Sequence, residues 1–165
     1  MKIVRRKGGT YILRFEKGEL YPKVFIRFLE KKKIRGGFFV GLGACVNPEI
    51  SFYDLRKKKY VTRRFRGGFE VLNLTGNVAM SNGKIIIHPH TRTRNYFSES
   101  AKRSSSFGVG VHQHVTLGAR NFKSLGGHLQ NFIVGGTLEI FLTPTPPLKR
   151  KFDSKTGLNL FSDLL

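Results

Sequence analysis

Residues 36–74, GGFFVGLGACVNPEISFYDLRKKKYVTRRFRGGFEVLNL, decide the fold class of this chain. Runs rich in β-branched and aromatic residues recur along this stretch at short spacing, which is typical of strands in a sheet. The stretch predicts four strands, at residues 38–46, 50–55, 60–65 and 69–74. Turn-forming residues separate them, first Asn47-Pro48 and then Asp54 with the basic run that follows it. Connections this short favour antiparallel pairing.

The residues before this stretch predict one strand and one helix. Residues 10–16 alternate between apolar and polar side chains and predict a strand. Residues 19–33 predict the main helix, with Pro22 in its first turn and lysines in its last turn. One helical face is apolar, and its members are Leu20, Val24, Phe25, Phe28 and Leu29.

The residues after this stretch predict further strands and one long polar segment. The strands are expected at residues 84–87, 107–115 and 137–142. Residues 91–111 are rich in serine, and we expect an inserted or mobile loop there. We therefore expect a single α+β domain over residues 1–147, in which one main helix packs on a mostly antiparallel sheet. Residues 148–165 are expected to form a C-terminal tail.

The charge of the chain points to a polyanionic partner. Its 165 residues contain 30 Lys+Arg and 10 Asp+Glu, a formal net charge of +20. This excess favours DNA binding through phosphate contacts, with low sequence specificity. We expect the contacts to come from Arg5, Arg6, Lys7, Lys31, Lys32, Lys33, Arg35, Arg56, Lys57, Lys58, Lys59, Arg63, Arg64 and Arg66.

Several classes of protein are excluded or disfavoured by the sequence. The single cysteine, Cys45, excludes an intrachain disulfide and a Cys-rich zinc ribbon, and its apolar neighbours predict a buried thiol. No apolar run is long enough for a membrane span, and no signal peptide is evident, so a cytoplasmic location is expected. Neither a G-x-S-x-G motif nor a phosphate-binding loop is present, which disfavours these two enzyme classes.

All five histidines lie between residues 88 and 128, and they suggest a metal site. His88 and His90 form one H-x-H pair, and His112 and His114 form another. On a strand, each pair points its two imidazoles to the same face. His128 follows Gly126-Gly127, which allows close backbone approach. Three imidazoles at one point would suit Zn²⁺ and leave a fourth position open, whereas the alternative is a set of structural histidines.

The order of motifs along the chain resembles the PPC family, the domain conserved between plants and prokaryotes. Matching segments cover about residues 10–143, from the first strand to the last. They are FEKGEL (15–20), GGFFVGLGA (36–44), FYD (52–54), GGFEVLNLTGN (67–77), HQHVTLG (112–118), GGHL (126–129) and LEI (138–140). The chain lacks the AT-hook core of the plant members and has Gly68 where they have arginine.

The resemblance implies a fold, an assembly and a function. It implies an α+β fold with a strongly bent, mostly antiparallel sheet and one packed helix, a homotrimer, and a non-catalytic role in DNA binding. It also implies zinc ligation by His112, His114 and His128. Residues 84–90 match the same family strand, so His88 and His90 are the alternative pair. A metal-dependent enzyme and a structural docking module are the alternative functions.

Overall fold

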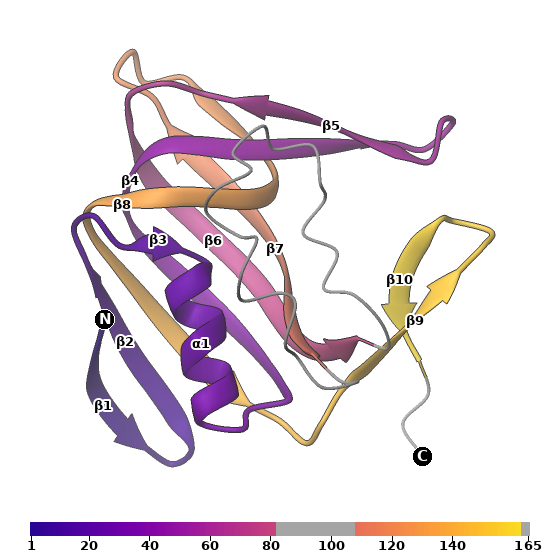
Figure 1. Ribbon diagram of the computed structural model, residues 1–165. Coiled ribbons are helices and arrows are strands. Elements are labelled where there is room, and N and C mark those ends of the chain that lie inside the picture. The colour runs from indigo at the N-terminus through magenta and orange to yellow at the C-terminus, as the bar shows by residue number, and fades with distance from the viewer. Residues whose placement is uncertain (82–107, 163–165) are drawn as a thin grey trace.

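The computed structural model describes residues 1–81 and 108–162, without the side chains of residues 5–7 and 81. Within these ranges the chain forms ten strands and one helix (Figure 1). The helix is α1 (Lys23–Lys31). The strands are β1 (Lys2–Lys7), β2 (Thr10–Glu16), β3 (Leu20–Tyr21), β4 (Gly36–Asp54), β5 (Lys59–Arg64), β6 (Gly68–Ser81), β7 (Gly108–Gly118), β8 (Ser124–Pro144), β9 (Lys149–Asp153) and β10 (Leu158–Phe161).

The described strands form one sheet with the order β1-β2-β8-β4-β6-β9-β10. The remaining strands join its sides: β3 pairs with β8, β5 with β4, and β7 with both β6 and β8. All of these pairings are antiparallel except the short contact between β6 and β9. Pairings of β8 with β4, β4 with β6, β6 with β7 and β7 with β8 close a ring of four strands. This ring places β7 directly beside the first residues of β8.

The antiparallel sheet is as expected, but β4 replaces two of the predicted strands. Asn47-Pro48 bends the strand without reversing it, and Figure 1 shows β4 and β8 each changing direction along their length. Pro48 has no N–H to donate to the ladder, so the register with β8 shifts between Val46 and Glu49. Asn47 instead exchanges hydrogen bonds with Gly67: its N–H donates to the Gly67 carbonyl, and its Oδ1 accepts from the Gly67 N–H.

The predicted helix is shorter than residues 19–33, and Pro22 precedes it rather than lying in its first turn. A residue before proline is disfavoured in the helical region, so Leu20 and Tyr21 remain extended and pair with β8 as β3. Phe25, Phe28 and Leu29 are the buried face of α1, as the apolar stripe predicts. The protein is thus mostly β. The expected α+β arrangement is met in part, because one helix does pack on one face of the sheet, but that helix has only nine residues.

The apolar core lies between α1 and the sheet. Phe25 contacts the ring of Phe39 on β4, with centroids 5.0 Å apart, and Tyr21 stacks on Phe132 of β8 at 5.0 Å. Cys45 is buried as predicted. Burial, with a smaller contribution from the nearby Glu70 carboxylate, raises the pKa of its thiol to about 12. This thiol therefore remains protonated and unreactive at neutral pH.

The residues after 148 are not an extended tail in the part of the chain that the structure describes. They form the β9–β10 hairpin, which joins the sheet through β6. The β4–β5 turn contacts it: Tyr53 Oη donates a hydrogen bond to the Thr156 carbonyl, and Lys58 Nζ donates one to the Ser154 carbonyl. Residues 91–107 of the expected loop and the strand at 84–87 lie outside the described residues, whereas 108–111 belong to β7. In the described ranges, no helix has the length and apolar character needed to cross a membrane.

Candidate metal centre

The H-x-H segment of β7 points its two histidines and its glutamine to opposite faces of the strand. Gln113 faces the core, where it is 2% exposed, accepts a hydrogen bond from Tyr21 Oη at 2.8 Å and donates one to the Leu129 carbonyl at 3.4 Å. Because side chains alternate along a strand, this anchored glutamine turns His112 and His114 together toward the other face. Their ring centroids lie 5.3 Å apart.

The third histidine arrives from the neighbouring strand, β8. His128 lies directly opposite His114 in the antiparallel pairing of β7 and β8. The two glycines before it allow this close passage between β7 and β4. A β-carbon at position 126 would lie 2.5 Å from the Val115 carbonyl oxygen, and one at position 127 would lie 2.9 Å from the Ser51 carbonyl oxygen. The expected role of Gly126-Gly127 is therefore confirmed.

The three imidazoles meet at one point. Ligand nitrogens of His112, His114 and His128 all lie within 4.8 Å of one another. An ion bound tetrahedrally at about 2.0–2.1 Å from each nitrogen requires nitrogens about 3.3 Å apart, which is below this upper limit. His112 and His128 are partly buried and His114 is exposed, so the site is open to solvent on one side. A set of three imidazoles with an open side fits Zn²⁺ or a similar transition metal.

The surroundings of His112 favour its neutral form. Its pKa is lowered to about 4, first because burial removes water from the charged ring, and then because Arg150 and His114 lie nearby. A metal ligand must be deprotonated, so this ring is ready for an ion at neutral pH. The ordinary pKa of histidine is near 6.5, so competition between protons and a metal ion at His112 moves to a lower pH.

Two residues that the sequence analysis did not single out also line the centre. The ring of Tyr60 on β5 lies 5.0 Å from that of His128. Arg150 of β9 places its Nη2 atom 3.5 Å from Nδ1 of His112. Arg150 lies in a short basic run at residues 149–151, but the sequence contains no pattern that connects it with a histidine 38 residues earlier.

The alternative histidine pair is not described, and two acidic residues lie elsewhere in the sheet. His88 and His90 lie outside the described residues. Glu70 and Glu139, two carboxylates with the chemistry of a general base, lie opposite Gly118 and Leu42 in the sheet. The histidine cluster in the described part of the chain contains no carboxylate.

The predicted DNA contacts lie on more than one part of the surface. Arg5, Arg6 and Lys7 belong to β1, and their side chains are among those not described. The others are exposed: Lys31, Lys32, Lys33, Arg35, Arg56, Lys57, Lys58, Lys59, Arg63, Arg64 and Arg66. Figure 1 shows the end of α1 and the β4–β5 turn at opposite sides of the molecule, so these residues do not form one patch.

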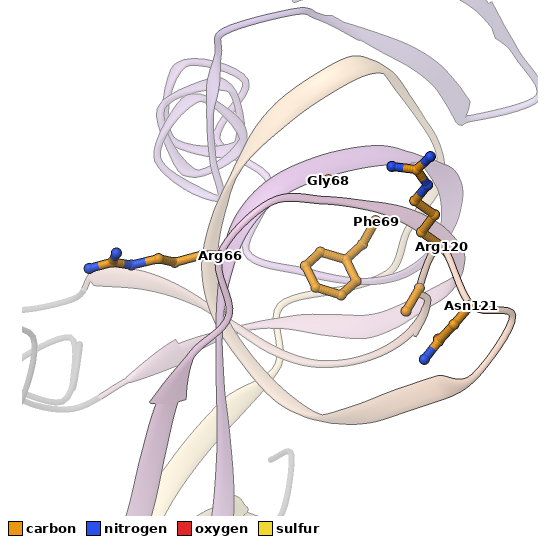
Figure 2. A pocket seen from close by; sticks show the side chains of 6 residues that line it. Arg66, Gly68, Phe69, Arg120 and Asn121 are labelled. Atoms are coloured by element: carbon orange, nitrogen blue, oxygen red, sulfur yellow. The ribbon is translucent and has the colours of Figure 1, made fainter.

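A shallow pocket of about 580 Å³ lies near one of these basic residues. It is lined by Arg66, Gly68, Phe69, Ala119, Arg120 and Asn121, and by none of the three histidines. In the view of Figure 2, the guanidinium groups of Arg66 and Arg120 lie on opposite sides of the Phe69 ring. Arg120 was not among the predicted contacts.

Comparisons with known proteins identify the family. The sequence profile of the Plants and Prokaryotes Conserved (PCC) domain matches residues 3–146. No curated protein matches the chain. Solved structures do match: a plant- and prokaryote-conserved (PPC) protein of Pyrococcus horikoshii has a TM-score of 0.74 and 29% identity, with 96% of this chain and 94% of that chain covered.

Two further structures have the same fold. A metal-containing protein of Archaeoglobus fulgidus has a TM-score of 0.74 and 26% identity over 99% of both chains. A candidate DNA-binding protein of Bacteroides thetaiotaomicron has a TM-score of 0.77 and 24% identity over 96% of this chain and 94% of that chain. The profile match and the shared fold together show that the chain belongs to the Plants and Prokaryotes Conserved domain family, which is the PPC family that its motifs resemble.

Proposed function

We propose that this protein binds a transition metal ion, with Zn²⁺ the best fit, through His112, His114 and His128. The observation that carries the proposal is the convergence of the three ligand nitrogens within 4.8 Å. Neutral imidazole is a common ligand of zinc in proteins, and His112 is held neutral by its surroundings. The similarity to a metal-containing protein of Archaeoglobus fulgidus supports the same function.

Three histidines leave a fourth coordination position for water or another ligand. When bound, the ion would act as a Lewis acid at that position. The residues of the chain orient the ligands: Gln113 fixes the face of β7, and the Gly126-Gly127 passage sets the position of His128. The centre is therefore proposed as a binding site, and a metal-dependent enzyme remains the alternative.

Metal content of purified variants tests the proposal. We expect about one ion per chain in the wild type, and loss of the ion in His128→Ala and in His112→Ala/His114→Ala. The pair His88→Ala/His90→Ala is the matched control and is expected to retain the metal. Circular dichroism of each variant checks that the fold persists. A wild type that takes up no zinc, nickel or manganese at pH 7.5 would contradict the proposal, and metal loss in the control pair would move the site to His88 and His90.

We also propose that the protein binds DNA through its exposed basic residues, with little sequence specificity. The supporting observation is a net charge of +20 with eleven of the predicted DNA-binding residues exposed on the surface. The Phe69 ring, which lies near Arg66 and Arg120, adds an aromatic surface on which a base can stack. The proposal includes no contacts with base edges, and the affinity is expected to come from contacts between the basic side chains and the phosphates.

The salt dependence of DNA retardation tests this second proposal. Replacing Lys57, Lys58 and Lys59 with glutamine should weaken binding to unrelated sequences about equally. It should also reduce the slope of log affinity against log salt by about 0.9 for each phosphate that the variant no longer neutralises. The charge-conserving replacement of the same lysines with arginine is the control. Binding that survives unchanged at high salt, or that strongly prefers one sequence, would contradict a mainly electrostatic interaction.

We further propose that the chain assembles as a homotrimer. The sheet face opposite α1 carries exposed apolar side chains on β4, where Phe38 is 54%, Val40 44% and Leu42 56% exposed. Phe141 of β8 pairs with Val40 and extends this apolar face. A contiguous apolar surface of this kind is typical of a protein–protein contact. The trimeric assembly implied by the family resemblance would cover it.

A further inference from the structure

Arg150 is held in place beside the candidate metal centre by residues of two elements, β6 and β10. Its Nη1 donates a hydrogen bond to the Asn159 carbonyl at 2.7 Å, and its Nη2 donates one to Oδ1 of Asn77 at 2.7 Å. The guanidinium carbon also lies 4.1 Å from the centroid of the Phe161 ring. Such contacts on several sides keep the long side chain in one position.

The hydrogen bond between Arg150 and Asn77 explains why the guanidinium lies close to His112. Asn77 of β6 is the register partner of His112 on β7. A side chain bound to Asn77 is therefore brought to the same level of the sheet as His112, and Nη2 of Arg150 lies 3.5 Å from Nδ1 of that ring. Arg150 lies beyond residues 3–146, to which the family profile extends.

The positive charge of the Arg150 guanidinium has no ion-pair partner in the described part of the protein. The ion pairs in residues 1–81 and 108–162 join the N-terminus, Lys2 and Arg14 to Glu16 and Glu19, and none of them includes Arg150. The three imidazoles are neutral when they bind an ion. A divalent ion and Arg150 would thus bring three positive charges together, which is unfavourable in a partly buried site unless an anion lies between them.

We propose that the metal ion and Arg150 together bind a small oxyanion, namely the phosphate or carboxylate group of a small molecule. This inference rests on the proposed metal site. One oxygen of the anion would take the open coordination position, and another would accept hydrogen bonds from Arg150. The guanidinium has five N–H groups, and the contacts with Asn159, Asn77 and His112 use at most three of them, so donors remain for the ligand.

A small anion suits the site better than the phosphate backbone of duplex DNA. Arg150 is half-buried, and its hydrogen bonds to the Asn159 carbonyl and to Asn77 Oδ1 hold it against β10 and β6 rather than out in solvent. The β9–β10 hairpin that carries it is held by the β4–β5 turn through Tyr53 and Lys58. The exposed lysines and arginines are the surface on which the proposed DNA binding depends.

The experiment uses the full-length protein loaded with Co²⁺, whose visible spectrum reports the ligands of the ion. Metal stoichiometry is measured first, and inorganic phosphate and acetate are then titrated separately. Both anions are expected to change the spectrum of the wild type. In Arg150→Gln the anion affinity should fall at least tenfold, while the affinity for Co²⁺ is equal or higher because a neighbouring cation is gone. Arg150→Lys should be intermediate, since it keeps the charge and loses the planar fork.

Lys151→Gln is the matched control, because Lys151 is an exposed neighbour on the same strand, and it should bind anions as the wild type does. Absence of metal from the wild type would overturn the metal site and, with it, this inference. Full metal content without an anion response, or equal anion affinity in Arg150→Gln, would overturn the anion site alone. A response to duplex DNA but not to phosphate or acetate would assign the site to nucleic acid and overturn the small-molecule proposal.

Discussion

At the scale of single residues, His112 contacts both parts of the proposed site, the metal ion and Arg150. It is a proposed metal ligand, and it is the imidazole that lies beside Arg150. Burial and that cation both disfavour its charged form, and together with His114 they lower its pKa to about 4. The same environment that prepares this ring for an ion makes the fold sensitive to acid.

The stability of the metal-free protein should therefore fall between about pH 6.5 and pH 4. The unfolded chain protonates His112 near pH 6.5, whereas the folded chain does so only near pH 4, so acid favours unfolding in that window. The contribution is fully present above pH 6.5, and its loss is at most about 3 kcal/mol, because water still reaches and screens the partly exposed ring. Urea denaturation at several pH values measures it. His112→Asn should show a shallower pH dependence than the wild type, and equal slopes would refute this assignment.

At the scale of elements, β8 determines the geometry of the centre. Its first residues pair with β7, its middle with the second half of β4, and its end with β2 and the first half of β4. At His128, β8 pairs with both β7 and β4, and this position sets His128 opposite His114. The glycines at 126 and 127 make that passage possible because they lack a β-carbon.

Gly126→Ala should weaken metal binding although it changes no ligand. A methyl group at this position would lie 2.5 Å from the Val115 carbonyl oxygen, so β8 must move away from β7 and carry His128 with it. We expect at least a tenfold loss of zinc affinity in a competition assay with a chelating dye. Gly136→Ala is the control on the same strand, because the nearest atom to its β-carbon is 4.0 Å away. Unchanged affinity in Gly126→Ala would show that the passage tolerates a side chain.

At the scale of the whole molecule, the two faces of the sheet differ in what covers them. Phe39 of β4 is fully buried and contacts Phe25 of α1, whereas Phe38 and Val40, its neighbours on the strand, are about half exposed on the opposite face. Water contact with such an apolar face is unfavourable. This asymmetry is the physical basis for the proposed self-association.

Light scattering coupled to size exclusion should give a mass of three times 18.7 kDa for the wild type. Val40→Asp should shift the mass toward the monomer, because a carboxylate in the centre of the apolar face would be desolvated on assembly. Val61→Asp, at a similarly exposed position on β5, should leave the mass unchanged. A concentration-independent monomer in the wild type would refute the trimer, and a trimer in Val40→Asp would place the interface elsewhere.

Local patterns in the sequence determined much of the fold. Alternation predicted the strand at 10–16, because side chains of a strand face two sides in turn. Apolar composition and turn signals predicted parts of β4, β5, β6, β7 and β8. The H-x-H spacing correctly placed His112 and His114 on one face. Element boundaries were less accurate where tertiary pairing prevailed: Leu20 and Tyr21 lie within the predicted helix but pair with β8.

The metal centre itself depends on relationships that no local pattern contains. The register that sets His114 opposite His128 is fixed by how β8 passes between two other strands. Arg150 reaches His112 because β9 pairs with the end of β6 and the Arg150 side chain extends back to Asn77. The sequence by itself determined which residues can ligate a metal and which face of β7 they share, because both follow from side-chain chemistry and from a period of two. Only the tertiary structure decided that three of them meet beside an arginine, because that depends on strand pairing between distant parts of the chain.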